Sequence, residues 1–147
     1  MPGRELASEL LCANVVWTGL GPEAHTASLF PGTKALHETR RLVVSTWAGQ
    51  CFTDRITLTP PVLNNAAGVV FLVSGEDKAL ALKAVLEGPD EPEQLPARLI
   101  RPAHGRLLWR VDRAAASLLQ AGQVRMPTSG GEAHPPRIHP LEGEVRP

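Results

Sequence analysis

The chain has 147 residues, enough for one domain with its own core, and 43% of them are hydrophobic, as in globular proteins. Fifteen basic and fifteen acidic residues cancel, so no global field attracts nucleic acid or an acidic membrane surface. No apolar run approaches the length of a membrane span, and the N-terminus lacks the apolar segment of a signal peptide. We therefore expect a soluble, cytoplasmic protein that binds neither nucleic acid nor membranes.

The cysteines and histidines do not have metal-site spacing. Cys12 and Cys51 form no CxxC pair, and we expect both to be reduced thiols or small buried side chains. The five histidines are scattered, and His134 and His139 lie among prolines, where no helix can bring them onto one face. The sequence therefore predicts no metal site.

Hydrophobic spacing predicts strands that alternate with helices along most of the chain. The helices are expected at 4–11, 25–29, 62–67, 76–87 and 112–120, with Pro31 ending the second, Ser74 capping the fourth and Asp112 capping the last. The strands are expected at 14–18, 42–45, 55–59, 69–73 and 107–111. The run 69–73 is apolar on both faces, which is typical of a central parallel strand.

This alternation predicts an α/β fold with a mainly parallel sheet and flanking helices. We assign residues 1–121 to that domain. From about residue 122 to 147, Gly, Pro, His and charged residues dominate without periodicity, which indicates a disordered tail.

The stretch from Gly19 to Gly32 carries the candidate chemistry. Gly19 and Gly21 follow an apolar strand and let the backbone turn sharply near a ligand. Glu23 and His25 come next, at the carboxyl end of a strand, where open α/β sheets bind their ligands. A histidine titrates near neutral pH, so His25 is suited to act as a general base.

Two other interpretations of this stretch are weaker. The glycines also fit the loose dinucleotide fingerprint, but that motif needs a long helix after the turn, and Pro31 stops the helix early. Glu38 lies near the distance expected for a ribose-binding acid, yet no clear strand presents it. Ser28 suggests a Ser/His pair, but it lacks the GxSxG elbow of serine hydrolases, so we expect it to pack or cap.

Several motifs in the same order resemble the C-terminal half of the 6-phosphogluconolactonases. They are Gly-Leu-Gly-Pro-Glu-Ala-His-Thr-Ala-Ser-Leu-Phe-Pro-Gly (19–32), Arg-Ile-Thr-Leu-Thr (55–59), Phe-Leu-Val-Ser-Gly-Glu-Asp-Lys (71–78), Ala-Val-Leu-Glu-Gly (84–88), Leu-Pro-Ala-Arg-Leu (95–99) and Trp-Arg-Val-Asp-Arg-Ala-Ala (109–115). The glucosamine-6-phosphate deaminases share a similar loop but follow its histidine with a different segment. The lactonase resemblance is therefore preferred.

The resemblance implies a Rossmann-like fold shared with those deaminases and with ribose-5-phosphate isomerase. It also implies hydrolysis of 6-phosphogluconolactone in the oxidative pentose phosphate pathway, without a metal or organic cofactor. By this resemblance, His25 is the general base with Glu23 beside it, and Arg55 and Lys78 bind the substrate phosphate. Gly19, Gly21 and Thr26 are expected to shape the pocket, with Thr26 donating to the loop backbone. Taken alone, Arg55 and Lys78 would be read as surface cations.

The sequence also departs from the family pattern. Glu23-Ala24 stands where the family has Asp-Gly, so the carboxylate reaches a different place and the alanine is strained if its φ is positive. The resemblance covers only the family's C-terminal half, so we expect the N-terminal half of the fold to be absent. The alternative function is therefore an inactive or split fragment that binds sugar phosphate, self-associates or pairs with a separate N-terminal half.

Overall fold

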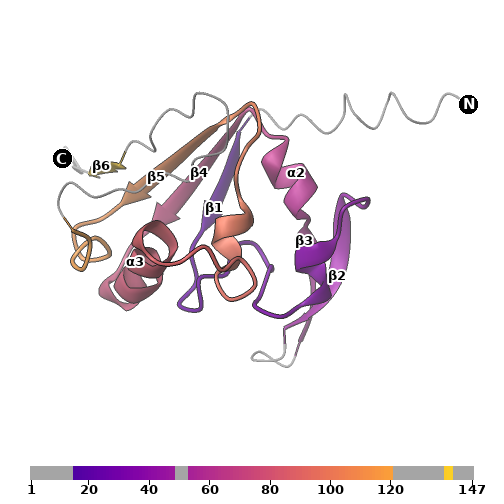
Figure 1. The fold of residues 1–147 in the computed structure, drawn as a ribbon, viewed down its shortest axis with the longest axis horizontal. Coiled ribbons are helices and arrows are strands. Elements are labelled where there is room, and N and C mark those ends of the chain that lie inside the picture. The colour runs from indigo at the N-terminus through magenta and orange to yellow at the C-terminus, as the bar shows by residue number, and fades with distance from the viewer. Residues whose placement is uncertain (1–14, 49–52, 121–137, 141–147) are drawn as a thin grey trace, which may run out of the picture.

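The computed structural model describes residues 15–48, 53–120 and 138–140. Its main sheet has four strands in the order β1 (Val16–Gly19), β4 (Gly68–Val73), β5 (Arg106–Val111) and β6 (Ile138–Pro140). Each strand runs parallel to its neighbour (Figure 1). The expected α/β fold with a parallel sheet is confirmed, and the apolar run predicted to be central is indeed β4.

Two further strands form an antiparallel hairpin that is separate from the main sheet. They are β2 (Val43–Ala48) and β3 (Thr53–Leu58), paired from Val43 with Leu58 to Ala48 with Thr53. Figure 1 shows this hairpin beside the sheet, beyond β1. Because the hairpin shares no ladder with the main sheet, its position depends on contacts made by side chains and loops.

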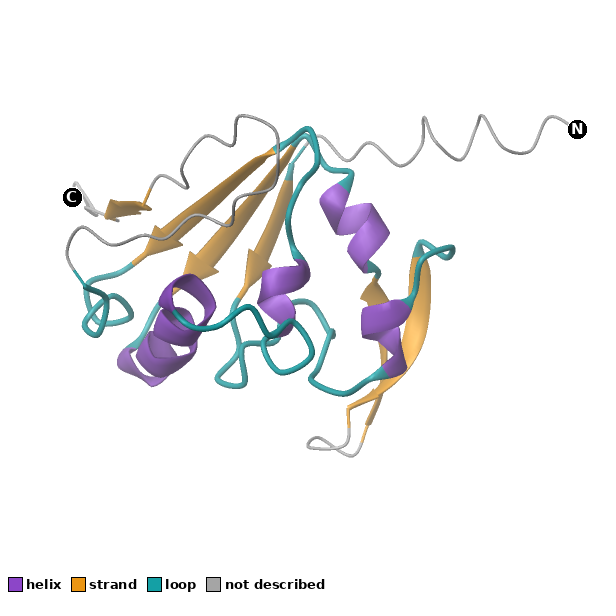
Figure 2. Ribbon diagram, in the orientation of Figure 1, coloured by secondary structure: helices purple, strands orange, loops and turns teal. Residues whose placement is uncertain are grey.

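The helical segments lie on one side of the sheet, as Figure 2 shows for α3 and η3. The α-helices are α2 (Pro60–Asn64) and α3 (Ala79–Glu87), and the 3₁₀ turns are η1 (Lys34–His37), η2 (Glu76–Lys78) and η3 (Pro96–Leu99). Prolines begin α2, because their fixed φ suits the first helical turn and their missing N–H is not needed there. The helix predicted at 76–87 is present as the 3₁₀ turn η2, which continues directly into α3.

The hydrophobic core lies between the sheet and these helices. Phe71 on β4 and Trp109 on β5 stack with ring centroids 4.0 Å apart and planes 9° apart. Leu82 of α3 is fully buried against the same cluster, as is Leu29 from the loop after β1. Each such side chain contributes about 1.5–3 kcal/mol by leaving water, so the loop is held by the same core that holds the sheet.

No described helix covers the opposite face of the sheet. Trp17 and Leu72 point to this face from neighbouring strands, since Trp17 is paired with Val70 and Gly19 with Leu72. Their exposed fractions are 65% and 45%, high values for large apolar side chains in a sheet. An α/β sheet normally has both faces covered, so this face is a candidate contact surface.

Two predicted helices, 25–29 and 112–120, are turns in the structure. Residues 25–29 form a tight turn in which Leu29 N–H donates to Thr26 C=O, with Ala27 at φ 52°. A right-handed helix needs φ near −60°, so this turn cannot continue as one. Residues 112–120 form consecutive turns, and Asp112 caps the first of them as predicted, because its Oδ1 accepts a hydrogen bond from Ala115 N–H at 2.7 Å.

Ser74 does not cap the helix after β4, contrary to the prediction. Its hydroxyl donates to Asp112 Oδ2 at 2.6 Å, and Gly75 N–H donates to the same oxygen at 3.0 Å. Asp112 therefore joins the ends of β4 and β5.

Most of the tail expected at 122–147 lies outside the described residues, but residues 138–140 of it pair with β5. The helix expected at 4–11 and both cysteines also lie outside the described residues.

Candidate active site

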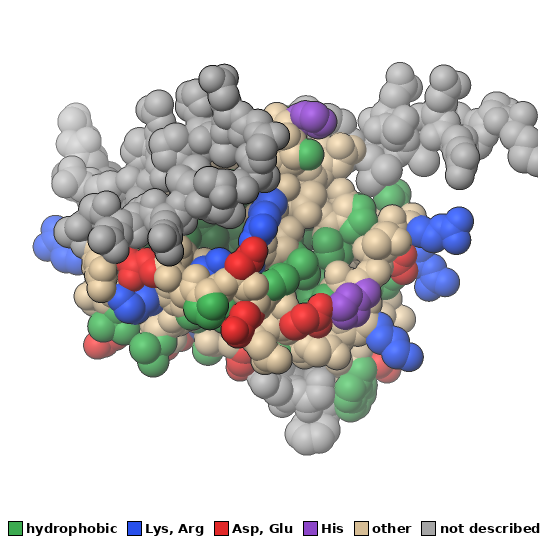
Figure 3. Space-filling view, in the orientation of Figure 1, with side chains coloured by type: hydrophobic (Ala, Val, Ile, Leu, Met, Phe, Trp, Pro, Cys, Tyr) green, Lys and Arg blue, Asp and Glu red, His purple; other side chains and the backbone are tan. Residues whose placement is uncertain are grey.

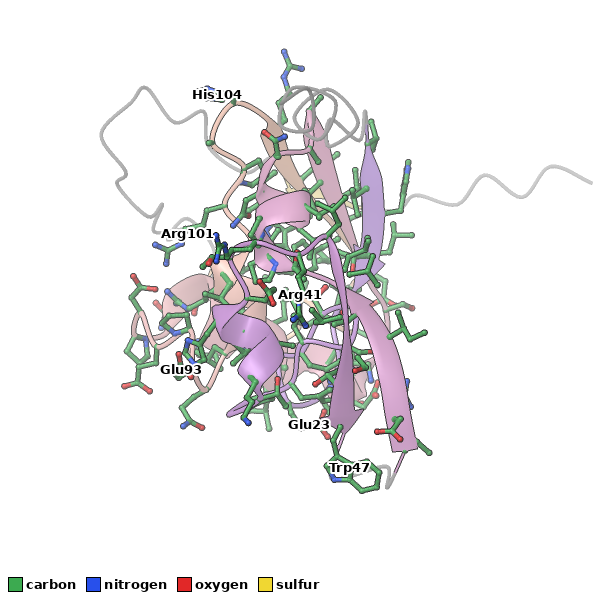
Figure 4. The ribbon with its side chains drawn as sticks, turned by 90° about the vertical axis from the view of Figure 1, so that its right-hand side faces the viewer. Glu23, Arg41, Trp47, Glu93, Arg101 and His104 are labelled. Carbon is green, nitrogen blue, oxygen red and sulfur yellow. The ribbon has the colours of Figure 1, made fainter. Side chains whose placement is uncertain are left out.

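The histidine loop, residues 20–32, lies at the carboxyl edge of the parallel sheet. β1 ends at Gly19, and β4 beside it runs in the same direction and ends at Val73, just before η2. The loop and η2 therefore emerge from the same edge, where open α/β sheets bind their ligands. In the view of Figure 4, Glu23 of this loop and Trp47 lie toward the lower end of the molecule, and His104 lies at the upper end.

Backbone hydrogen bonds close the first part of the loop into a compact turn. Gly21 N–H donates to His25 C=O, and Ala24 N–H donates to Gly21 C=O, both at 2.9 Å. A Cβ atom on Gly21 would lie 1.9 Å from Cε1 of the His25 ring, closer than atoms can approach. Glycine at position 21 is therefore required by the position of the imidazole.

Gly19 is in a different situation. It is the last residue of β1, and a Cβ atom there would meet nothing closer than Leu72 C=O at 3.9 Å, an ordinary contact. The geometry at Gly19 therefore does not require glycine.

The His25 ring is fixed on three sides. Its Nδ1 lies 3.0 Å from Glu23 Oε2, and the Phe30 ring packs against it with centroids 4.3 Å apart. Gly21 supplies the third contact. Because Glu23 is acceptor-only when ionised, it selects the tautomer with the proton on Nδ1. Within the described ranges Nε2 has no hydrogen-bond partner, and the His25 side chain as a whole is 24% exposed.

The two departures from the family pattern, Glu23 and Ala24, have opposite consequences. The longer Glu23 side chain does reach the imidazole, so the acid keeps an orienting contact. Ala24 has φ 58°, in the left-handed region, where an alanine costs about 1 kcal/mol or more relative to glycine. Its methyl group is buried in the core, and its carbonyl accepts from Ala97 N–H at 2.9 Å, so tertiary contacts hold the strained residue in place.

Two side-chain contacts attach the second half of the loop to neighbouring strands. Thr26 Oγ1 lies 2.6 Å from Thr18 Oγ1 on β1, so its hydroxyl bonds a side chain rather than the loop backbone we had expected. Ser28 N–H donates to Thr57 Oγ1 on β3 at 3.0 Å, and both residues are buried. The sequence analysis did not identify Thr18 or Thr57 as part of the site.

Arg55 lies on β3 and Lys78 on η2, and no described hydrogen bond or ion pair joins either of them to His25. Arg55 is exposed on β3, and no described residue forms an ion pair or hydrogen bond with its side chain. Lys78 ends η2, and its Nζ lies 2.6 Å from Asp77 Oδ2. The structure thus brings Glu23 and His25 together, whereas no described hydrogen bond or ion pair joins Arg55 or Lys78 to this pair.

Among the described residues there is one other histidine–carboxylate pair: His37 Nε2 lies 3.3 Å from Glu93 Oε1, and both side chains are exposed and outside the histidine loop. A shallow hollow of about 330 Å³ is lined by Arg40, Arg41, Asn64 and their neighbours, away from the histidine loop, and it contains no acid–base pair. No group of three His, Cys, Asp or Glu side chains among the described residues could hold a metal ion. Basic and acidic residues are interspersed on the face in Figure 3, without a large area of one sign.

The fold defines an α/β protein whose candidate site is a histidine–carboxylate pair at the carboxyl edge of a parallel sheet. Comparison with known proteins gives the family. Residues 3–109 match the model for "Glucosamine-6-phosphate isomerases/6-phosphogluconolactonase". A 6-phosphogluconolactonase of Rattus norvegicus is 45% identical over 102 residues, which are 69% of this chain and 39% of the relative. One from Synechocystis sp. is 43% identical over 73% of this chain and 43% of its own.

Solved structures agree with this result. The 6-phosphogluconolactonase from Trypanosoma cruzi superposes with a TM-score of 0.64 and 28% identity, over 74% of this chain and 41% of that one. The chain therefore belongs to the 6-phosphogluconolactonase family. It spans about two fifths of the length of the curated relatives it matches. Of the helices that the structure describes, none has the length and apolar character needed to cross a membrane.

Proposed function

We propose that the chain hydrolyses 6-phosphogluconolactone to 6-phosphogluconate in the cytoplasm. The observation that carries this proposal is the hydrogen bond from His25 Nδ1 to Glu23, which leaves Nε2 as the unprotonated ring nitrogen that can act as a base. Family membership supports the choice of substrate, because relatives that match most of this chain bear the name of this lactonase. A lactone is an activated ester, so its hydrolysis needs only a nucleophilic water and stabilisation of the developing negative charge.

In the proposed reaction, His25 Nε2 takes a proton from water as the oxygen attacks the lactone carbonyl. The tetrahedral intermediate then collapses, the bond between the carbonyl carbon and the ring oxygen breaks, and the imidazolium returns the proton to that oxygen. Glu23 stabilises the imidazolium while the proton is held there. A positioned base of this kind contributes about 10²–10⁴ to the rate.

Arg55 and Lys78 are proposed to bind the phosphate group of the substrate. Arg55 has a guanidinium that no described residue engages, and guanidinium groups match phosphate oxygens in geometry. Lys78 is paired with Asp77, and this exposed pair costs little to exchange for a phosphate. Gly21 and Thr26 belong to the proposed site through the shape of the loop, by the contacts described above.

The assay compares the purified chain with His25→Ala for loss of 6-phosphogluconolactone above the spontaneous rate. His37→Ala is the matched control, because His37 pairs with the exposed Glu93 and lies outside the loop. We expect turnover by the wild type and the control, and none by His25→Ala. Equal rates for all three proteins would show that the chain does not catalyse this reaction.

A second candidate function is a sugar-phosphate-binding half-domain that self-associates or pairs with a polypeptide equivalent to the rest of the family fold. Two observations favour it: the strained Ala24 in the loop, and the exposed Trp17 and Leu72 on the sheet face that no described helix covers. Size-exclusion chromatography with light scattering distinguishes the two functions. A monomer with full turnover contradicts the half-domain, whereas a dimer that dissociates in Trp17→Ser supports it.

A further inference from the structure

The hairpin β2–β3 carries Arg55, and the hairpin's position relative to His25 is not set by the main sheet. β3 pairs with β2 alone, while His25 follows β1 of the other sheet. In the proposed function, Arg55 binds one end of the substrate and His25 acts at the other. The spacing between the two sheets therefore determines whether a single molecule can reach both residues.

The register of the hairpin places Arg55 and Thr57 on the same face. Residues two apart on a strand point the same way, so these two side chains are about 7 Å apart along β3. Thr46 is paired with Arg55 and shares this face, and both Thr46 and Thr57 are buried. Ile56 points the other way and is 78% exposed, so the face with Arg55 and Thr57 is the one turned toward the rest of the molecule.

Thr57 makes a direct hydrogen bond to the histidine loop. Its Oγ1 accepts from Ser28 N–H at 3.0 Å and donates to Leu58 C=O at 3.0 Å, so the hydroxyl orientation is determined. Ser28 comes three residues after His25, and the intervening turn is closed by Leu29 N–H donating to Thr26 C=O. The connection from the strand of Arg55 to the histidine is therefore short and stiff.

We infer that Thr57 is a positioning residue that sets the spacing between Arg55 and His25 through its hydrogen bond to Ser28. This inference rests on the proposed function for the identity of the two-ended ligand. Thr57 itself touches neither substrate nor the imidazole. Its effect should therefore appear only with ligands that engage both ends of the site, and not with a ligand that engages the cations alone.

The test compares two probes by NMR titration, inorganic phosphate and the product 6-phosphogluconate, on four proteins. Thr57→Val removes the acceptor at nearly constant volume, and Thr57→Ser restores it. Thr46→Val is the matched control, because it removes the hydroxyl of another buried threonine on the same face, for which no described hydrogen bond exists. The amide shift of Ser28 reports the hydrogen bond itself.

In Thr57→Val we expect phosphate affinity to stay within about twofold, while 6-phosphogluconate affinity and lactonase kcat/KM fall about tenfold to a hundredfold, as for an ångström-scale misplacement. Thr57→Ser and Thr46→Val should remain close to the wild type. Unchanged 6-phosphogluconate binding in Thr57→Val would overturn the positioning role alone. Failure of the wild type to bind 6-phosphogluconate would instead overturn the proposed function, and the inference with it.

Discussion

His25 Nδ1 lies 3.0 Å from Glu23 Oε2, within a turn of the chain that is closed by two backbone hydrogen bonds. The pair comes from residues only two positions apart, so its geometry depends on local backbone conformation more than on the packing of distant elements. This explains how the loop keeps an oriented imidazole although its acid is one methylene longer than the aspartate of the family pattern.

Glu23→Gln should lower lactonase activity without unfolding the protein. The amide can still accept from Nδ1–H, but it carries no charge to stabilise the imidazolium, so we expect about a tenfold to hundredfold loss, part of what a positioned base supplies. Steady-state turnover measures this loss. Glu93→Gln is the control, because Glu93 is exposed and pairs with His37. A fully active Glu23→Gln would remove the carboxylate from the mechanism.

Gly21→Ala and Gly19→Ala should differ sharply, although the two glycines lie one residue apart. The new Cβ at position 21 would overlap the His25 ring, whereas at position 19 it makes an ordinary contact. We expect Gly21→Ala to displace the ring, with a large change in the NMR shifts of His25, and Gly19→Ala to leave those shifts in place. Identical spectra for the two variants would contradict the geometry of the loop.

Ala27→Gly should have a larger free energy of unfolding than Ala24→Gly. Both alanines have positive φ, 52° and 58°, so glycine relieves about 1–2 kcal/mol at either position and loses about 0.4–1 kcal/mol through the freer unfolded chain. Ala27 is exposed, but Ala24 has a buried methyl group, worth about 0.8 kcal/mol more. Urea unfolding measures the two free energies. Greater stability of Ala24→Gly would reverse the expected order.

Asp112 should contribute stability that is lost in acid. The hydroxyl of Ser74, then the amides of Ala115 and Gly75, hold the pKa of this carboxyl below its usual value of 3.8. A carboxyl with a depressed folded-state pKa stabilises the fold above the unfolded-state value, and the contribution disappears as pH falls through the folded value. Unfolding free energy should therefore fall less steeply below pH 4 in Asp112→Asn than in the wild type.

The control for this prediction is Asp54→Asn, since no described residue donates a hydrogen bond to the exposed Asp54 side chain. It should follow the wild-type pH dependence. A parallel pH dependence for Asp112→Asn and the wild type would show that the carboxyl does not link the ends of β4 and β5 in solution.

The sequence predicted the sheet better than it predicted the loops. The strand at 69–73 was correctly expected to be central, because a run that is apolar on both faces is typical of a parallel strand with a neighbour on each side, as β4 lies between β1 and β5. The position of His25 at the carboxyl edge followed from the glycines after a strand. Both features depend on residue types over a few consecutive positions, which a sequence displays directly.

The predictions that failed depended on tertiary partners. Apolar spacing favoured a helix at 25–29, but Thr57 and Thr18 bind this segment from strands that lie elsewhere in the chain. Ser74 had the spacing of a helix cap, yet Asp112, 38 residues away, takes its hydroxyl. The alternation of 55–59 places Thr57 on the same face of the strand as Arg55, and this was the available sequence signal that Thr57 could bind the histidine loop.

The tryptophans of this chain occupy three different environments, so each can serve as an intrinsic optical probe. Trp109 is 2% exposed and stacked on Phe71, so its emission follows the integrity of the core. Trp17 lies on the sheet face that no described helix covers, and Trp47, 54% exposed, lies on the hairpin. Versions of the protein that keep one tryptophan at a time would report global unfolding, association through the sheet face and movement of the hairpin as separate fluorescence signals, without an added label.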